Sequence, residues 1–290
     1  MTAVSAQTTP RMTVAEPHIA DIPIIDLSVL HKGNVSQAEL DEVVKQVRFA
    51  CENIGFFQIV NHGVSLELQR AVFQASRKFF ELPMSEKMAM KRDPYGNRGY
   101  EILGGQVLEG AVEGTHMKMQ SGYSGMDLKE VHYIGKERAP GDPMLKKRFN
   151  GLNKLPPAVP EFPMVMAEYY DTMYDLAVKV MEVIALYSLL QEGNTNIRTL
   201  GLDKSYFMDT GFCVEGVAAV RLLRYPPQQG GPPRIGAGAH TDFAAVTLLM
   251  EDGVEGLQIW DSKSSSWADV KAVPGIATLF LRKKQKVNDP

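Results

Sequence analysis

The sequence predicts an α+β protein whose helical N-terminal region packs on a β-rich core of the sandwich or jelly-roll type. Three observations support this fold class: β-like and helix-like segments alternate at the front of the chain, one long apolar helix follows, and short β-like runs occupy the last quarter. With 290 residues, of which 44% are hydrophobic and 22% charged, the chain can bury a sizeable core. We expect residues 1–21 to be a disordered tail and residues 22–290 to form a single domain.

The composition argues against several classes of partner. A net charge of −3 provides no field that would attract nucleic acid or an anionic membrane, so we expect a small-molecule partner. The first twenty residues contain no apolar run long enough for a signal peptide or a membrane span, which predicts a cytoplasmic protein. Cys51 and Cys213 form no Cys-x-x-Cys pair, and we expect both to be reduced thiols.

Residues 22–135 are expected to form the N-terminal region, with strands at 23–27 and 56–60. Between these strands, Ser36 and Glu39 have the Ser-x-x-Glu spacing of a capping box, which predicts that a helix begins there. Apolar residues at helical spacing predict the face that this helix buries: Leu40, Val43, Val44, Val47 and Ala50.

Two further helical segments and a loop-rich region are predicted in the middle of the chain. A helix runs from Leu68 to Phe80, before Pro83 interrupts the pattern. Residues 95–157 are rich in Gly and Pro, so we expect long loops with short strands. The apolar pattern over 160–192 predicts one long helix that is buried along much of its surface. Its expected core positions are Met164, Tyr169, Met173, Leu176, Val180, Val183, Ile184 and Tyr187.

Residues 215–281 are expected to form a partial jelly-roll core. Short β-like runs alternate there with turns, which is the pattern of a sandwich or jelly roll. The predicted strands are 217–225, 246–250, 257–260, 267–270 and 276–281.

His240 and Asp242 are the most informative pair of residues in the sequence. On a strand, residues i and i+2 point to the same side, so the imidazole and the carboxylate can face one metal ion. One His and one carboxylate are two-thirds of the facial triad that holds Fe(II). A His-x-Asp pair also arises by chance in surface turns, and the pair alone leaves both interpretations open.

Several motifs in the same order give the pair its context. These motifs are Pro-Ile-Ile-Asp-Leu at 23–27, Gly-Phe-Phe-Gln-Ile-Val-Asn-His-Gly-Val at 55–64, Arg-Leu-Leu-Arg-Tyr-Pro at 221–226, Gly-Ala-His-Thr-Asp at 238–242 and Gly-Leu-Gln-Ile at 256–259. Through them, the sequence resembles the non-haem Fe(II), 2-oxoglutarate-dependent oxygenases of the isopenicillin N synthase-like superfamily over residues 22–280. The resemblance implies a double-stranded β-helix core.

The resemblance also implies a site. His240 and Asp242 would be metal ligands for Fe(II), 2-oxoglutarate would bind the same metal, and the phenol of Tyr225 would contact the carboxylate of the cosubstrate or substrate. A tyrosine that only closes a strand before Pro226 is an equal alternative for Tyr225. We expect Arg221 and Arg224 to be exposed; the alternative is that one of them faces the pocket and binds an anion while the other faces solvent. His62 is expected to serve a structural turn.

The sequence departs from the family pattern after residue 281. The family places a second metal histidine just over fifty residues beyond the aspartate and follows it with an Arg-x-Ser pair that binds 2-oxoglutarate. Only 48 residues follow Asp242, none of them histidine, and the chain closes in a basic run over 282–290. We therefore expect a C-terminally truncated core that lacks its last strands. His116 and His132 are weak candidates to replace the missing ligand.

The function that the resemblance implies is the Fe(II)- and 2-oxoglutarate-dependent oxidation of a small-molecule metabolite by O₂, with release of succinate and CO₂. Hydroxylation, desaturation and ring closure are all open outcomes. Two alternatives remain at this point: a truncated, non-catalytic binding or regulatory protein that keeps the oxygenase scaffold, and a metal reaction that does not use 2-oxoglutarate. Because the distal His and the Arg-x-Ser pair are absent, we expect low activity from this 290-residue chain.

Overall fold

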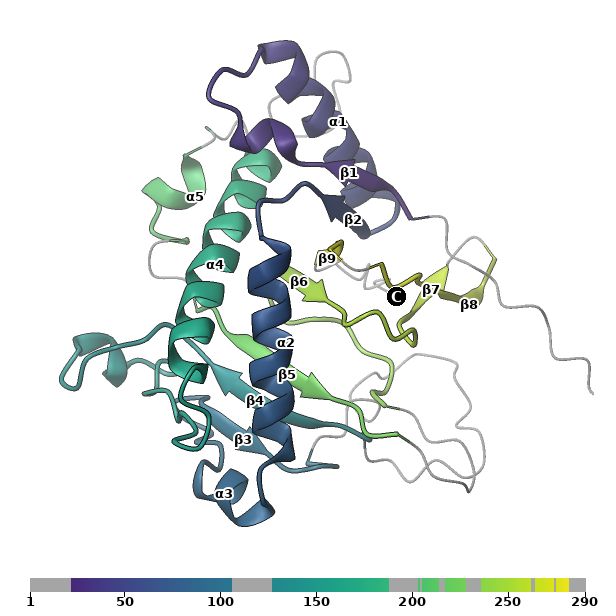
Figure 1. The fold of residues 1–290 in the computed structure, drawn as a ribbon. Coiled ribbons are helices and arrows are strands. Elements are labelled where there is room, and N and C mark those ends of the chain that lie inside the picture. The colour runs from purple at the N-terminus through teal and green to yellow at the C-terminus, as the bar shows by residue number, and fades with distance from the viewer. Residues whose placement is uncertain are drawn as a thin grey trace, which may run out of the picture.

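The structure, a computed structural model, shows helices packed against sheets that are built from both ends of the chain (Figure 1). The predicted N-terminal tail and the basic run at 282–290 lie outside the residues that it describes. The described residues are 22–105, 127–187, 203, 205–213, 217–227, 236–261, 264–273 and 275–281.

A four-stranded sheet joins the two ends of the described chain. Its strand order is β1-β2-β9-β6, with β1 parallel to β2 and the other pairs antiparallel. Gln58 of β2 lies opposite Thr278 of β9, so the N-terminal and C-terminal segments share one sheet. The strands are β1 (Ile24–Asp26), β2 (Phe56–Val60), β6 (Val246–Met250) and β9 (Ala277–Leu281).

A second, antiparallel sheet has the order β3-β4-β5, and β7 and β8 form a separate hairpin. The strands are β3 (Gly99–Glu101), β4 (Glu130–Ile134), β5 (Val220–Arg224), β7 (Gln258–Asp261) and β8 (Ser266–Asp269). Every residue of β4 is buried, although the sequence predicted only loops with short strands in this region. The five strands predicted after residue 215 are all present, with bounds that shift by at most three residues.

The first helices begin and end where the local sequence predicts. In α1 (Gln37–Asn53), the Ser36 hydroxyl accepts from the Glu39 backbone and the Glu39 carboxylate accepts from the Ser36 backbone, which confirms the capping box. Gly55, with φ of 94°, takes the left-handed conformation that favours glycine after a helix. α2 (Leu66–Glu81) stops before Pro83, and the short α3 (Met84–Ala89) follows.

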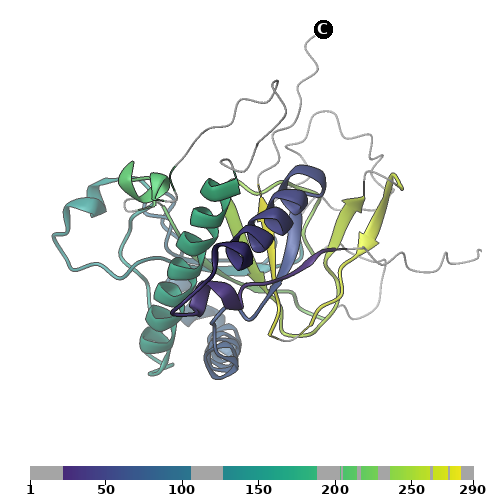
Figure 2. The same cartoon turned by 90° about the horizontal axis from the view of Figure 1, so that it is seen from above.

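The long helix α4 (Phe162–Tyr187) packs against both α1 and α2, and the short α5 (Tyr206–Asp209) lies beside it (Figure 2). Two 3₁₀ helices, η1 (Ser28–His31) and η3 (Pro143–Lys146), connect other elements. The prediction that Met164 belongs to the core was wrong, because its side chain is 71% exposed while Val165 and Met166 beside it take the buried positions. Other predicted core residues of α4 are buried: Tyr169, Met173, Leu176, Val180 and Val183.

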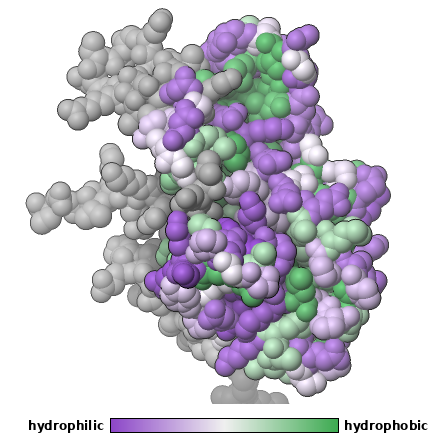
Figure 3. All heavy atoms as spheres, turned by 90° about the vertical axis from the view of Figure 1, so that its left-hand side faces the viewer, coloured by the Kyte–Doolittle hydropathy of each residue, from purple (hydrophilic) through white to green (hydrophobic). Residues whose placement is uncertain are grey.

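On the α5 side of the molecule, the surface consists of hydrophilic residues interspersed with clusters of hydrophobic residues (Figure 3). Among the helices that the structure describes, none combines the length and the apolar character needed to cross a bilayer. Cys51 and Cys213 are free thiols, as expected.

Candidate metal site

Side chains alternate along each strand of the β3-β4-β5 sheet, so successive residues point to opposite faces of the sheet. One of these faces packs on the hydrophobic core, and the other is turned away from it. His132 and Leu222 lie opposite each other and point into the core. Tyr133 and Arg221, also opposite each other, point the other way, and the Arg221 guanidinium lies 5.2 Å from the centroid of the Tyr133 ring. The alternation places Tyr225, just after β5, on this second face.

His240 and Asp242 lie in the loop before β6, not on a strand as expected from their spacing. Their side chains nevertheless meet, with 3.6 Å between His240 Nε2 and Asp242 Oδ1. The two side chains are 37% and 29% exposed, respectively, so small molecules can reach them. The predicted pair is therefore brought together by loop geometry instead of strand alternation.

Each member of the pair favours the charged form of the other. The contact with the Asp242 carboxylate raises the pKa of His240, and burial opposes this change only in part. The same contact with His240 lowers the pKa of Asp242, and the positive charge of Arg221 lowers it further. Arg221 is exposed as predicted, and its charge also acts on Asp242.

Tyr225 is half-exposed and lies against the segment that leads to His240. A Cβ atom on Gly236 would lie 2.8 Å from the Tyr225 ring, so only glycine allows the chain to pass this close. Partial desolvation raises the pKa of Tyr225, and the charge of Arg221 opposes that change. The Tyr225 ring therefore lies next to the segment that leads to His240.

Arg224 differs from Arg221 although both are exposed. Its guanidinium donates to Glu130 Oε1 at 2.6 Å, and Glu130 also accepts from Lys87 and Tyr100 on the core side of the sheet. The pKa of Glu130 is lowered because these hydrogen bonds outweigh the effect of burial. Arg224 therefore belongs to a structural network and not to the candidate site.

Neither His62, which was expected to serve a turn, nor His132, a weak candidate ligand, joins the pair. His62 is buried, lies 3.0 Å from the Gly275 carbonyl oxygen and accepts from the Val64 amide, which fits a structural turn. His132 is fully buried between Phe79 and Phe162. His116 lies outside the described residues.

His240 and Asp242 fit a metal ion in distance and chemistry. Metal–nitrogen and metal–oxygen bonds are about 2.0–2.2 Å long, so donor atoms 3.6 Å apart can contact one ion between them. Across the described ranges, no group of three or more His, Cys, Asp or Glu side chains forms a possible metal site. The described part of the chain therefore offers two ligands of the facial triad.

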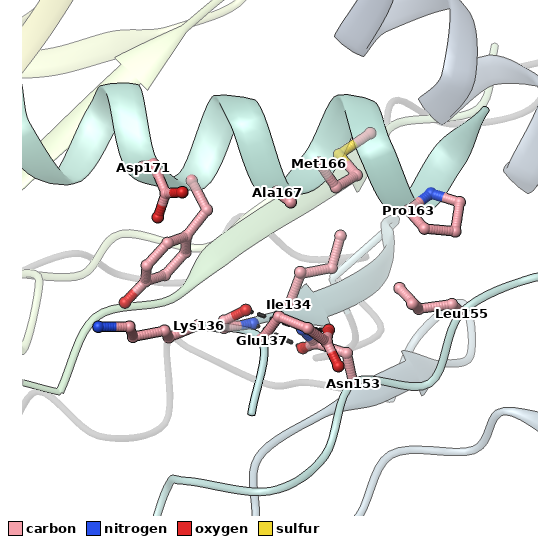
Figure 4. Close-up of a pocket in the computed structure, with 11 residues that line it drawn as sticks. Ile134, Lys136, Glu137, Asn153, Leu155, Pro163, Met166, Ala167 and Asp171 are labelled. Atoms are coloured by element: carbon pink, nitrogen blue, oxygen red, sulfur yellow. Dashed lines mark hydrogen bonds between the residues drawn. The ribbon is translucent and has the colours of Figure 1, made fainter. Parts of the chain in front are cut away.

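A separate pocket lies between α4 and the segment after β4 (Figure 4). Asn153 closes one side of it by bonding the backbone N–H and carbonyl of Gly135. With a volume of about 120 Å³ it is smaller than the roughly 300–1,000 Å³ of typical small-molecule sites. Neither His240 nor Asp242 lines this pocket, so we do not assign it to the reaction.

Comparison with known proteins shows the family to which the chain belongs. Residues 22–158 match the family model for the N-terminal region of the non-haem dioxygenases in morphine synthesis, and residues 216–286 match that of the 2OG-Fe(II) oxygenase superfamily. A 2-oxoglutarate-Fe(II) type oxidoreductase of Aspergillus fumigatus is 38% identical, over 90% of this chain and 73% of its own length. The oxidoreductase hxnY of Emericella nidulans is 39% identical, over 89% of this chain and 69% of its own length.

A solved structure agrees with the sequence relatives. A Neurospora crassa protein in complex with alpha-KG and thymine superposes with a TM-score of 0.69 and 26% identity over 90% of this chain and 74% of that one. The likeness confirms the predicted double-stranded β-helix fold. The names of the relatives support oxidation of a small molecule with Fe(II) and 2-oxoglutarate over a non-catalytic role. The chain belongs to the 2-oxoglutarate- and Fe(II)-dependent oxygenase superfamily.

Proposed function

We propose that His240 and Asp242 are the Fe(II) ligands of this oxygenase and that Tyr225 contacts the 2-oxoglutarate cosubstrate. The observation that carries the proposal is the 3.6 Å approach of His240 Nε2 to Asp242 Oδ1 in an accessible loop. An imidazole nitrogen and a carboxylate oxygen are ligands that suit Fe(II) and leave positions open for other ligands. When bound, Fe(II) with 2-oxoglutarate supplies the oxidising chemistry.

The chain's own residues hold and orient the reactants. The Asp242 carboxylate stays ionised near neutral pH, since its pKa is lowered by His240 and Arg221. The Tyr225 phenol lies beside the loop of the ligands, where its hydroxyl can donate to an anionic oxygen. The similar Neurospora crassa protein forms a complex with alpha-KG and thymine, which supports a substrate of similar size, a small metabolite, for this protein.

An anaerobic titration of the 290-residue chain with Fe(II) and 2-oxoglutarate tests the ligands. We expect a visible metal-to-ligand charge-transfer band that His240→Ala and Asp242→Ala each abolish, because each removes one of the two donors. His31→Ala is the matched control, since His31 is an exposed histidine of another element, η1, and should leave the band unchanged. A band that survives in folded His240→Ala protein would contradict the proposal.

A further inference from the structure

Asp127 and Lys129 form an ion pair that is buried beside the loop of the proposed metal ligands. Lys129 Nζ lies 2.8 Å from Asp127 Oδ2, and the side chains of Lys129 and Asp127 are 3% and 0% exposed, respectively. Removing two charges from water is unfavourable, so a buried ion pair is weak evidence for a purely stabilising role. The second carboxylate oxygen of Asp127 makes a further contact, which indicates an additional role for the pair.

Asp127 Oδ1 accepts a hydrogen bond from the backbone N–H of Gly238 at 3.0 Å, across 111 residues of sequence. The carbonyl of the same glycine lies 2.8 Å from His240 Nδ1. Gly238 is therefore held by Asp127 on one side and bonded to the ligand imidazole on the other. A continuous series of polar contacts runs from Lys129 through Asp127 and Gly238 to His240.

The contact with Gly238 fixes which nitrogen of His240 carries hydrogen. A carbonyl oxygen can only accept, so Nδ1 must be the donor in this bond. The charged form that Asp242 favours also carries hydrogen on Nε2; when the ring loses that proton, the lone pair is on Nε2, the atom that faces Asp242. A metal ligand needs its lone pair on the metal side, and the bond made by the other ring nitrogen normally sets this tautomer.

We propose that Asp127 is a positioning residue for the metal site: by holding Gly238 it fixes the orientation and the tautomer of His240. Lys129 binds the other carboxylate oxygen, so that Oδ1 stays directed at the Gly238 amide. The proposal rests on the proposed function in one respect, since it takes His240 as an Fe(II) ligand. The part that concerns the tautomer holds without metal.

Two double variants isolate the hydrogen bond from the ion pair. Asp127→Asn with Lys129→Met keeps an oxygen acceptor for Gly238 and leaves no buried charge. Asp127→Leu with Lys129→Met has a similar volume and no acceptor. Both variants lack the ion pair, and they differ in whether residue 127 can accept a hydrogen bond from the Gly238 amide. Near-ultraviolet circular dichroism checks that both are folded.

We expect the leucine variant to bind Fe(II) about 10–100-fold more weakly than the asparagine variant, as for other outer-shell partners of metal ligands. The measurement is anaerobic competition with a chelating dye, with Fe(II) alone as the probe. Equal affinities in the two folded variants would overturn the proposal. Asp142 provides the matched control, because it also accepts a backbone N–H, from Met144, and pairs with an arginine, Arg138. Asp142→Leu with Arg138→Met should leave Fe(II) affinity unchanged.

Two measurements on the metal-free protein separate this proposal from the proposed function. ¹⁵N NMR of the His240 ring, recorded on the alkaline side of its titration where the ring is neutral, should show hydrogen on Nδ1 in the wild-type chain and the asparagine variant, and a mixture of tautomers in the leucine variant. The Gly238 amide of the wild-type chain should exchange with solvent about 100-fold more slowly than exposed amides of the same loop. If this amide exchanges as fast as its neighbours, Asp127 does not hold it, whether or not Fe(II) binds.

Discussion

The two faces of the β3-β4-β5 sheet come from the same three strands and have opposite characters. On the core face, Glu130 is bonded to Lys87, Tyr100 and Arg224, and His132 is enclosed by aromatic rings of α2 and α4. On the other face, Arg221 lies over the Tyr133 ring, and its positive charge lowers the pKa of Asp242.

The difference separates stability from chemistry within one sheet. On the core face, Glu130 and His132 are buried, and Arg224 reaches the surface at the end of its strand. On the other face, the charge of Arg221 acts on Asp242, which belongs to an exposed pair that is open to ligands. Substitutions on the core face should therefore change the free energy of unfolding, whereas those on the site face should change pKa values and metal binding.

The largest expected effect is that of Glu130→Gln. This change leaves the ammonium of Lys87, which is 5% exposed, without a carboxylate, and uncompensated buried charges typically cost about 3–5 kcal/mol. Urea unfolding should report the loss. Glu130→Gln combined with Lys87→Met should recover part of it, since no buried charge then remains. A loss below about 1 kcal/mol would show that water reaches Lys87 and would weaken the contrast between the faces.

A smaller effect is expected from the pH dependence of His132. Burial lowers its pKa to about 4, from 6.5, and the Lys154 backbone offsets this only in part. Between pH 6.5 and pH 4, His132 is therefore protonated in the unfolded state and neutral in the folded state. The free energy of unfolding is highest above pH 6.5 and falls as the pH drops toward 4. The loss attributable to His132 at about pH 5 should be about 2 kcal/mol.

Comparison with His132→Phe identifies this contribution. The phenylalanine ring fits among Phe79 and Phe162 and does not titrate. Unfolding free energies at about pH 7.5 and about pH 5 should differ by about 2 kcal/mol more in the wild-type chain than in the variant. Parallel pH profiles would mean that the imidazole becomes protonated within the folded core.

The smallest effect on stability is expected from Arg221→Gln, paired with Arg224→Gln on the same strand. Both side chains are exposed, so each change should cost less than about 1 kcal/mol. Arg221→Gln should raise the pKa of Asp242 and of Tyr225, because Arg221 lowers both. NMR titration of the Asp242 carboxyl carbon measures the first shift. An equal shift in Arg224→Gln would mean that the two faces are not electrostatically distinct.

Local patterns predicted most of the fold. The Ser36–Glu39 capping box and the five late strands depend on residues close in sequence, and all were found. β4 was missed as a buried strand because Glu130 and His132 are atypical of a core. Their burial depends on Lys87, Arg224 and the aromatic rings, which lie far away in the sequence.

The site shows the same limit. The His-x-Asp spacing together with the family resemblance identified His240 and Asp242 as a pair, and the structure brings their side chains together, in a loop and not on a strand. Asp127 could not be identified from sequence, since its contact with Gly238 spans 111 residues and involves a backbone N–H that leaves no signature in the side chains. Once β4 is known to be a strand, the alternation of its side chains predicts that Tyr133 points to the face opposite Glu130 and His132, away from the core.

The pairing of β2 with β9 has a consequence for synthesis of the protein. Gln58 is synthesised about 220 residues before its partner Thr278. At a translation rate of roughly 5–20 residues per second, this distance corresponds to about 10–40 s. Until then, β2 presents one unpaired edge and an apolar surface, which is the feature that promotes strand addition between chains. Such long-range pairing also slows folding itself. We expect nascent chains that end before residue 277 to remain bound to chaperones, with release dependent on β9 leaving the ribosome.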